Sequence, residues 1–311
     1  MAGVPAWLVA GWAALSGACV GSFLNVVIAR VPAGESVVTP RSRCPRCQRP
    51  IAWYDNLPVL SWLLLRGRCR GCALPISLRY PVVELLGGGL GWLAWHRHGF
   101  TLAALAEFAF TALLLALAAI DLDTWLLPNA LTWPLLALGL ACGALGLSAA
   151  ASLTSAAVGA GLGFGAFWLV SVLGEKAFKK EALGFGDVWL LTGLGAWLGA
   201  AALLPVVLLA STQGAVVGLL LIAIGKAQPG PVEASDPIPT PDLTPASFPT
   251  RPPDSASPPG SAAEPAVGDD GAWIPPRYAV PFGPFLVAGA LEWLWLGDRL
   301  AALVPLLEVF R

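Results

Sequence analysis

Two acidic residues at the edges of apolar segments are the side chains best suited to chemistry. Asp187 ends the stretch Gly-Phe-Gly-Asp, whose glycines are Gly184 and Gly186, and Asp121 lies at the end of another apolar run. A carboxylate beside a membrane-length apolar segment is costly to place and usually has a function. Two carboxyl groups held close together share a proton, so that one activates water and the other polarises a carbonyl. Asp121 and Asp187 are therefore predicted to form the catalytic pair of an aspartyl protease.

Asp123 is an alternative to Asp121 as the partner of Asp187. Residues two apart on an α-helix point about 200° away from each other, so these two side chains cannot both face the same interior. Spacing alone does not choose between them. Gly184 and Gly186 are predicted to support the active site, because glycine frees the backbone and leaves room for a neighbouring helix or a substrate.

Four of the six cysteines form two CxxC pairs, which suggests a metal site. They are Cys44, Cys47, Cys69 and Cys72, and the two inner cysteines are separated by 21 residues. This spacing is close to that of a zinc ribbon, and four thiolates satisfy tetrahedral Zn²⁺ with no open position, so the zinc would be structural. The alternative is two disulfides, which need an oxidising compartment.

The composition indicates a membrane protein with several spans. Of 311 residues, 57% are hydrophobic and only 12% are charged, against about 25% charged in a soluble domain. We predict an all-α polytopic membrane protein with about eight transmembrane helices and a small zinc-ribbon-like module between the first and second. The apolar runs of suitable length are 5–28, 80–95, 101–120, 130–147, 153–173, 188–204, 205–225 and 279–297.

Arginine and lysine residues predict the orientation, because cytoplasmic loops are enriched in them. Nine arginines lie in the loop after the first span, at 30, 41, 43, 46, 49, 66, 68, 70 and 79. With this loop in the cytoplasm and the N-terminus outside, only Arg97, Arg299 and Arg311 of the 18 basic residues fall outside. Asp121 and Asp187 then lie at the same depth on the cytoplasmic side, and the reducing cytoplasm favours zinc over disulfides.

The chain divides into five predicted segments. They are a first transmembrane helix (1–29), a cytoplasmic four-cysteine zinc module (30–79), a transmembrane peptidase core (80–225), a linker (226–276) and a C-terminal transmembrane helix (277–311). The linker holds 14 of the 28 prolines, so we expect it to be disordered. No repeat is evident. Glycines four apart, such as Gly159 and Gly163, predict close packing of helices rather than a dinucleotide fingerprint.

Six short motifs in the same order make the chain similar to the prepilin leader peptidases, bacterial inner-membrane aspartyl proteases of the GxGD type. The motifs are at 21–28, at the two CxxC pairs, and at 77–86, 120–129, 184–187 and 281–286. The first aspartate of the 120–129 motif is the catalytic one in that family. The resemblance therefore selects Asp121 over Asp123.

The resemblance implies removal of the leader peptide from type IV prepilins or related pseudopilins, by a cut after a glycine at the cytoplasmic face of the inner membrane. It also implies N-methylation of the new N-terminus with S-adenosylmethionine, for which no residue is assigned as the donor site. The expected cofactors are structural Zn²⁺ and S-adenosylmethionine. The expected partners are the pilin substrates and the lipid bilayer, with no nucleic acid.

Several polar or unusual residues have no assigned role. Glu84 and Asn25 are predicted to face the bundle interior, where Glu84 is either structural or part of a methylation site. His96 and His98 are expected to be solvated in the outer loop. Trp189 stands where the similar family commonly has a lysine.

Two other classes of function remain as alternatives. A transporter or proton-relay protein would also place acids in the membrane, but near the midplane and beside broken helices. A non-catalytic scaffold of a pilus or secretion machine would keep the zinc module and the spans, yet it would not need both aspartates and their glycines.

Overall fold

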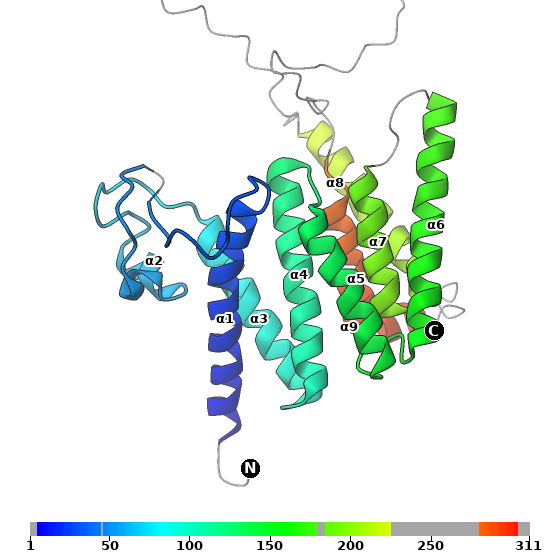
Figure 1. Ribbon diagram of the computed structural model, residues 1–311, viewed down its shortest axis with the longest axis horizontal. Helices are drawn as coiled ribbons and strands as arrows, with labels where there is room; N and C mark the ends of the chain where they lie inside the picture. Colours follow the sequence, from blue (N-terminus) through cyan, green and yellow to red (C-terminus); the bar gives the residue numbers. More distant parts are fainter. Residues whose placement is uncertain (1–4, 45, 179–183, 225–279, 304–311) are drawn as a thin grey trace, which may run out of the picture. The chain divides into compact units, whose positions relative to one another are not determined.

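The computed structural model describes residues 5–44, 46–178, 184–224 and 280–303, which form helices and no strand (Figure 1). The predicted all-α class is confirmed, while the predicted linker 226–276 lies outside the described residues. The long helices are α1 (Ala6–Arg30), α3 (Arg79–His98), α4 (Leu102–Thr124), α5 (Asn129–Ala144), α6 (Leu153–Phe178), α7 (Phe185–Leu198), α8 (Leu203–Ala223) and α9 (Gly283–Leu303). The short ones are η1 (Trp53–Asn56), α2 (Leu60–Leu64) and η2 (Ala200–Ala202).

Four of these helices are long and apolar enough to cross a membrane. They are α1, α4, α6 and the segment Ala200–Ala223, which contains α8. The helices α5 and α7 are apolar but shorter. Each of the eight predicted spans coincides largely with one long helix, so the helices are where the hydropathy places them. The count of eight spans itself stays a prediction.

Helix α4 is central to the packing, since it contacts α1, α3, α5 and α9. Its side chains Phe110, Leu114, Leu117 and Ile120 are fully buried. Phe110 also stacks on Trp197 of α7, with ring centroids 4.3 Å apart and an interplanar angle of 6°. A helix that is apolar on all sides lies in a protein core or spans a membrane, and the neighbouring helices cover half of the α4 span.

Glycines bring α6 and α7 into backbone contact. A Cβ atom added to Gly159 would collide with the carbonyl oxygen of Gly195, and one added to Gly195 would collide with that of Gly159. A Cβ on Gly163 would lie 2.7 Å from the carbonyl oxygen of Leu191. The close helix packing predicted from Gly159 and Gly163 is confirmed.

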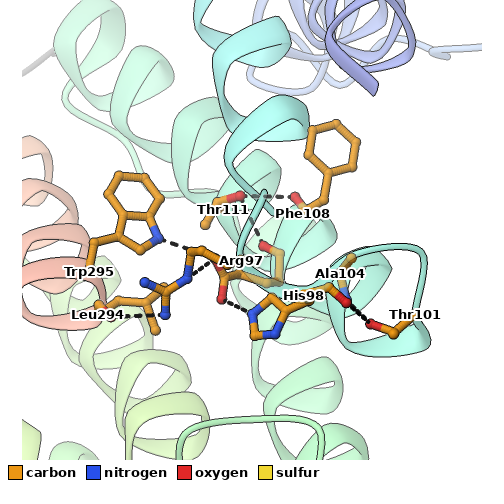
Figure 2. A network of polar contacts seen from close by, with 9 residues as sticks. Arg97, His98, Thr101, Ala104, Phe108, Thr111, Leu294 and Trp295 are labelled. Atoms are coloured by element: carbon orange, nitrogen blue, oxygen red, sulfur yellow. Dashed lines mark hydrogen bonds and ion pairs between the residues drawn. The ribbon is translucent and has the colours of Figure 1, made fainter. Parts of the chain in front are cut away.

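A polar cluster ties α3, α4 and α9 together at the end of α4 opposite to Asp121 (Figure 2). The buried Glu107 carboxylate lies 3.2 Å from Arg97 Nε and 2.7 Å from His98 Nε2, and it accepts a hydrogen bond of 3.2 Å from Trp295 Nε1. The expectation that His98 is merely solvated is wrong. His98 is one of the groups that satisfy a buried carboxylate, since buried charges require partners.

The glycine contact predicts that two glycine-to-alanine changes on α6 differ in their effect on the melting temperature. Gly159→Ala should lower the melting temperature in detergent, because its methyl group has no room and overpacking costs about 1–3 kcal/mol. Gly161→Ala is the matched control, because its Cβ would meet nothing within 4 Å. We expect no loss there, since alanine favours a helix over glycine by about 1 kcal/mol. Equal melting temperatures for the two variants would contradict the contact.

The polar cluster predicts a large loss of stability when its carboxylate is removed. Glu107→Ala leaves Arg97, His98 and Trp295 without their acceptor, which should cost about 2 kcal/mol or more. Thermal unfolding followed by tryptophan fluorescence measures the effect. The exposed Glu175→Ala on α6 is the control and should change stability by less than about 0.5 kcal/mol. Equal stability of the two variants would show that the cluster contributes nothing.

Candidate active site

Asp121 lies in the last turn of α4, where its side chain is only 5% exposed. The helix ends because Trp125 adopts a left-handed conformation, with φ 59°, and its N–H donates to the Asp121 carbonyl at 2.9 Å. A left-handed residue is a common helix terminator. Asp121 is therefore held on a regular helix at the point where the chain turns towards α5.

Asp187 lies in the first turn of α7 and is partly buried. Gly184 precedes the helix in an extended conformation, and its carbonyl accepts the Asp187 N–H at 3.0 Å. A carboxylate in the first turn also faces the positive end of the helix dipole. The Gly-Phe-Gly-Asp stretch thus serves as the start of a helix that directs its acid into the bundle.

The fold brings Asp121 and Asp187 together. The charge of Asp121 is close enough to act electrostatically on Asp187. The backbone N–H of Gly283, at the start of α9, donates to the Asp121 carboxylate. In contrast, Asp187 Oδ1 is buried and has no hydrogen-bond partner among the described residues. The pair therefore combines one oriented carboxylate with an oxygen that is free to bind a reacting group.

The glycines around the pair differ in what they do. A Cβ on Gly186 would lie 2.7 Å from Leu127 Cβ, so this position has no room for a side chain. A Cβ on Gly283 would collide with Asp121 Oδ2. At Gly184, by comparison, a Cβ would make only an ordinary contact of 3.5 Å with Asp187 Oδ2. Gly283 was not among the predicted site residues, and its only sequence signal is the 281–286 motif.

Asp123 is on the other side of α4 from Asp121. It is exposed and forms an ion pair with Arg79 at the start of α3. The helical geometry expected for residues two apart is confirmed, and it is Asp121 that faces Asp187.

The four cysteines of the CxxC pairs form one cluster. Their sulfur atoms all lie within 4.8 Å of one another, with 3.9 Å between Cys44 and Cys72 and 4.0 Å between Cys47 and Cys69. None of these four is in a disulfide. Tetrahedral zinc with bonds of about 2.3 Å requires sulfur atoms about 3.8 Å apart. The cluster could therefore hold a metal ion of this kind.

Two matching turns build the cysteine cluster. In the first turn Cys44 N–H donates to the Arg49 carbonyl at 3.0 Å, and in the second Cys69 N–H donates to the Leu74 carbonyl at 2.9 Å. Backbone N–H groups of Cys72 and Gly71 lower the pKa of Cys69 to about 6, whereas, despite the backbone N–H of Leu74, burial and the neighbouring thiols raise the pKa of Cys72 to about 11. Both turns carry the sequence Arg-Cys-x-x-Cys-x-x-Pro, a repeat of eight residues. The expectation that the chain has no repeat is wrong at this scale.

Two buried polar residues of the bundle make contacts near the cysteine module, and one of them attaches the module to α3. Glu84 Oε2 accepts a hydrogen bond of 2.7 Å from Val59 N–H, just before α2. Asn25 Nδ2 of α1 donates to the Tyr80 carbonyl at 3.1 Å. Glu84 thus makes a structural contact, as one of its two predicted roles requires. Both side chains are buried, so the Glu84 contact secures the module against α3, and the Asn25 contact holds α1 against the first turn of α3.

Trp189 belongs to an aromatic group beside the pair rather than to the pair itself. Its ring lies 5.4 Å from Phe164, 5.8 Å from Trp133 and 6.2 Å from Phe185, measured between centroids. Two residues after Asp187, it points to the opposite side of α7. The tryptophan therefore packs α7 against α5 and α6.

Comparisons with known proteins agree with these features. Residues 15–98 match the bacterial peptidase A24 N-terminal domain, and residues 108–219 match the type IV leader peptidase family. No solved structure matches the chain.

Similar proteins from three bacteria share the name prepilin leader peptidase/N-methyltransferase. The protein from Myxococcus xanthus is 44% identical, covering 93% of this chain and 90% of its own. That from Stutzerimonas stutzeri is 42% identical, over 69% and 81% of the two chains. That from Klebsiella pneumoniae is 47% identical, over 63% and 88%. With this similarity extending over nearly its whole length, the chain belongs to the type IV leader peptidase family.

Proposed function

We propose that the protein is a membrane aspartyl endopeptidase that removes the leader peptide from type IV prepilins or pseudopilins. The observation that carries this proposal is the convergence of Asp121 and Asp187 from two separate helices, with one carboxylate oxygen of Asp187 buried and unpaired. The names of the relatives, which specify a prepilin leader peptidase, supply the substrate class.

The chemistry follows from two close carboxyl groups that hold one proton between them. The ionised group takes a proton from a water molecule as the water attacks the scissile carbonyl carbon, and the protonated group donates a hydrogen bond to the carbonyl oxygen. Both carboxyl groups are then protonated, and one of them gives its proton to the leaving amine. The pair again holds a single proton, as at the start. Because the two groups titrate as a unit, neither aspartate is assigned a permanent acid or base role.

We infer that the active site faces the cytoplasm and that the N-terminus of α1 lies outside. The Arg-rich segment 31–78 joins the end of α1 to the start of α3, and the antiparallel α4 returns Asp121 to that same end of the bundle. Arginine enrichment of this end supports a cytoplasmic location in the inner membrane. A leader peptide in the cytoplasm, joined to an apolar helix in the bilayer, would then present its junction to the pair.

The cysteine cluster is proposed to hold one structural Zn²⁺ through Cys44, Cys47, Cys69 and Cys72. Four sulfur donors at tetrahedral spacing leave no position for water or substrate, so the ion would stabilise the module rather than take part in cleavage. We also propose N-methylation of the new N-terminus with S-adenosylmethionine, which rests on the methyltransferase in the relatives' names. No residue of this chain is assigned to the donor.

The transporter and scaffold alternatives are not favoured. Asp121 and Asp187 lie at the ends of regular helices rather than beside a break near the middle of a span. A scaffold has no need of an unpaired buried carboxylate oxygen, which is costly unless it serves a ligand.

The carboxylate pair predicts that each aspartate is indispensable. Asp121→Asn and Asp187→Asn should each reduce cleavage of a model prepilin by about a thousandfold or more, because an amide cannot exchange the proton. Product is measured by the mobility shift of the shortened pilin after co-expression. Asp123→Asn is the control and should cleave at close to the wild-type rate. Cleavage that survives in either of the first two variants would exclude the proposed mechanism.

The cysteine module predicts one zinc ion per chain, measured by elemental analysis of the purified protein. Replacing both Cys44 and Cys47 by serine should abolish the zinc, because two ligands cannot retain a structural ion. Cys19→Ser, a change of a cysteine outside the cluster, is the control and should leave the zinc content intact. Undiminished zinc in the double variant would refute the four-cysteine assignment.

A further inference from the structure

Leu127, on the short connection between α4 and α5, lies between the two glycines that border the carboxylate pair. A Cβ on Gly186 would lie 2.7 Å from Leu127 Cβ, and one on Gly283 would lie 3.4 Å from Leu127 Cδ1. Gly186 directly precedes Asp187, and Gly283 contacts Asp121. One aliphatic side chain therefore occupies the space between α7 and α9 beside both carboxylates.

The connection that carries Leu127 has little freedom to move. It begins at the left-handed Trp125, which is hydrogen-bonded to the Asp121 carbonyl, and it ends at Pro128 before α5. Leu127 also packs against the buried core. Displacing its side chain by several ångströms would disturb the backbone that holds Asp121, so Leu127 acts as a fixed wall.

A peptide that is to be cleaved must bring its scissile bond within hydrogen-bond reach of both carboxyl groups. The buried, unpaired Asp187 Oδ1 marks where a polar atom of the peptide or the attacking water would bind. The connection 125–128 lies beyond the end of α4, whereas α7 continues from Asp187 into the apolar bundle. In a substrate that runs from water into the bilayer, the leader residue just before the scissile bond would thus lie against Leu127.

We propose that Leu127 determines the size of the substrate residue accepted immediately before the scissile bond. This proposal rests on the proposed peptidase function. The glycines at 186 and 283 allow the helices to close around Leu127, and a substrate side chain larger than that of glycine would collide with this wall. Leu127 is a specificity-determining residue, and it takes no part in proton transfer.

The test compares model prepilins that carry glycine, alanine or valine before the scissile bond. In purified wild-type enzyme in detergent, kcat/KM should fall steeply from glycine to alanine. Leu127→Ala removes three carbon atoms from the wall. It should raise the ratio of kcat/KM for the alanine substrate to kcat/KM for the glycine substrate by about tenfold, the order expected for one methyl group. Leu126→Ala is the matched control, because the adjacent leucine is 56% exposed, and its ratio should equal the wild-type ratio.

An unchanged ratio in Leu127→Ala would overturn the proposal, and so would an equal rise in Leu126→Ala. If Leu127→Ala fails to fold, as its melting temperature would show, Leu127→Val replaces it. The valine variant should raise the same ratio to a smaller extent, and an unchanged ratio there also overturns the proposal. These results are distinct from failure of the peptidase function itself, in which the wild type cleaves no prepilin or Asp121→Asn and Asp187→Asn remain active.

Discussion

Two carboxylates that repel each other inside an apolar helix bundle are the constraint on which the rest of the structure depends. Asp121 is buried and Asp187 is partly buried, so water screens their interaction poorly. Such a pair persists only when the two groups share a proton and the surrounding protein prevents them from separating. Both acids accordingly lie on helices rather than in loops, and the α9 backbone donates a hydrogen bond to Asp121.

Two polar contacts far apart along the helices hold α4 and α9 in place beside the pair. At the start of α9 Gly283 contacts Asp121, and further along the helix Trp295 donates to Glu107. The paired positions are 14 residues apart on α4 and 12 on α9, or about 21 and 18 Å along each axis. Apolar packing alone would allow one helix to slide along the other, whereas two separate polar contacts determine their register.

Much of the architecture was predictable because membrane helices and CxxC turns depend on local sequence. The eight long helices lie where the apolar runs are, and the four cysteines of the two pairs converge as their spacing indicates. Apart from the eight-residue repeat of the cysteine turns, what the sequence did not predict concerns contacts between distant segments. Nothing near His98 in sequence identifies its partner Glu107 as buried, and nothing near Gly283 indicates that it closes against Asp121. Trp189 likewise acquires its role only from rings on α5 and α6.

The sequence by itself determined the class of protein, the candidate acids and the cysteine module, because hydropathy, residue type and short spacing act within one segment. The choice between Asp121 and Asp123 shows the limit of that information. Helical geometry requires the two side chains to face opposite ways, but only the packing of α4 against its neighbours directs Asp121 inward and leaves Asp123 paired with Arg79 at the surface. The tertiary structure also placed Leu127 between Gly186 and Gly283, since three segments that are remote in the chain meet there.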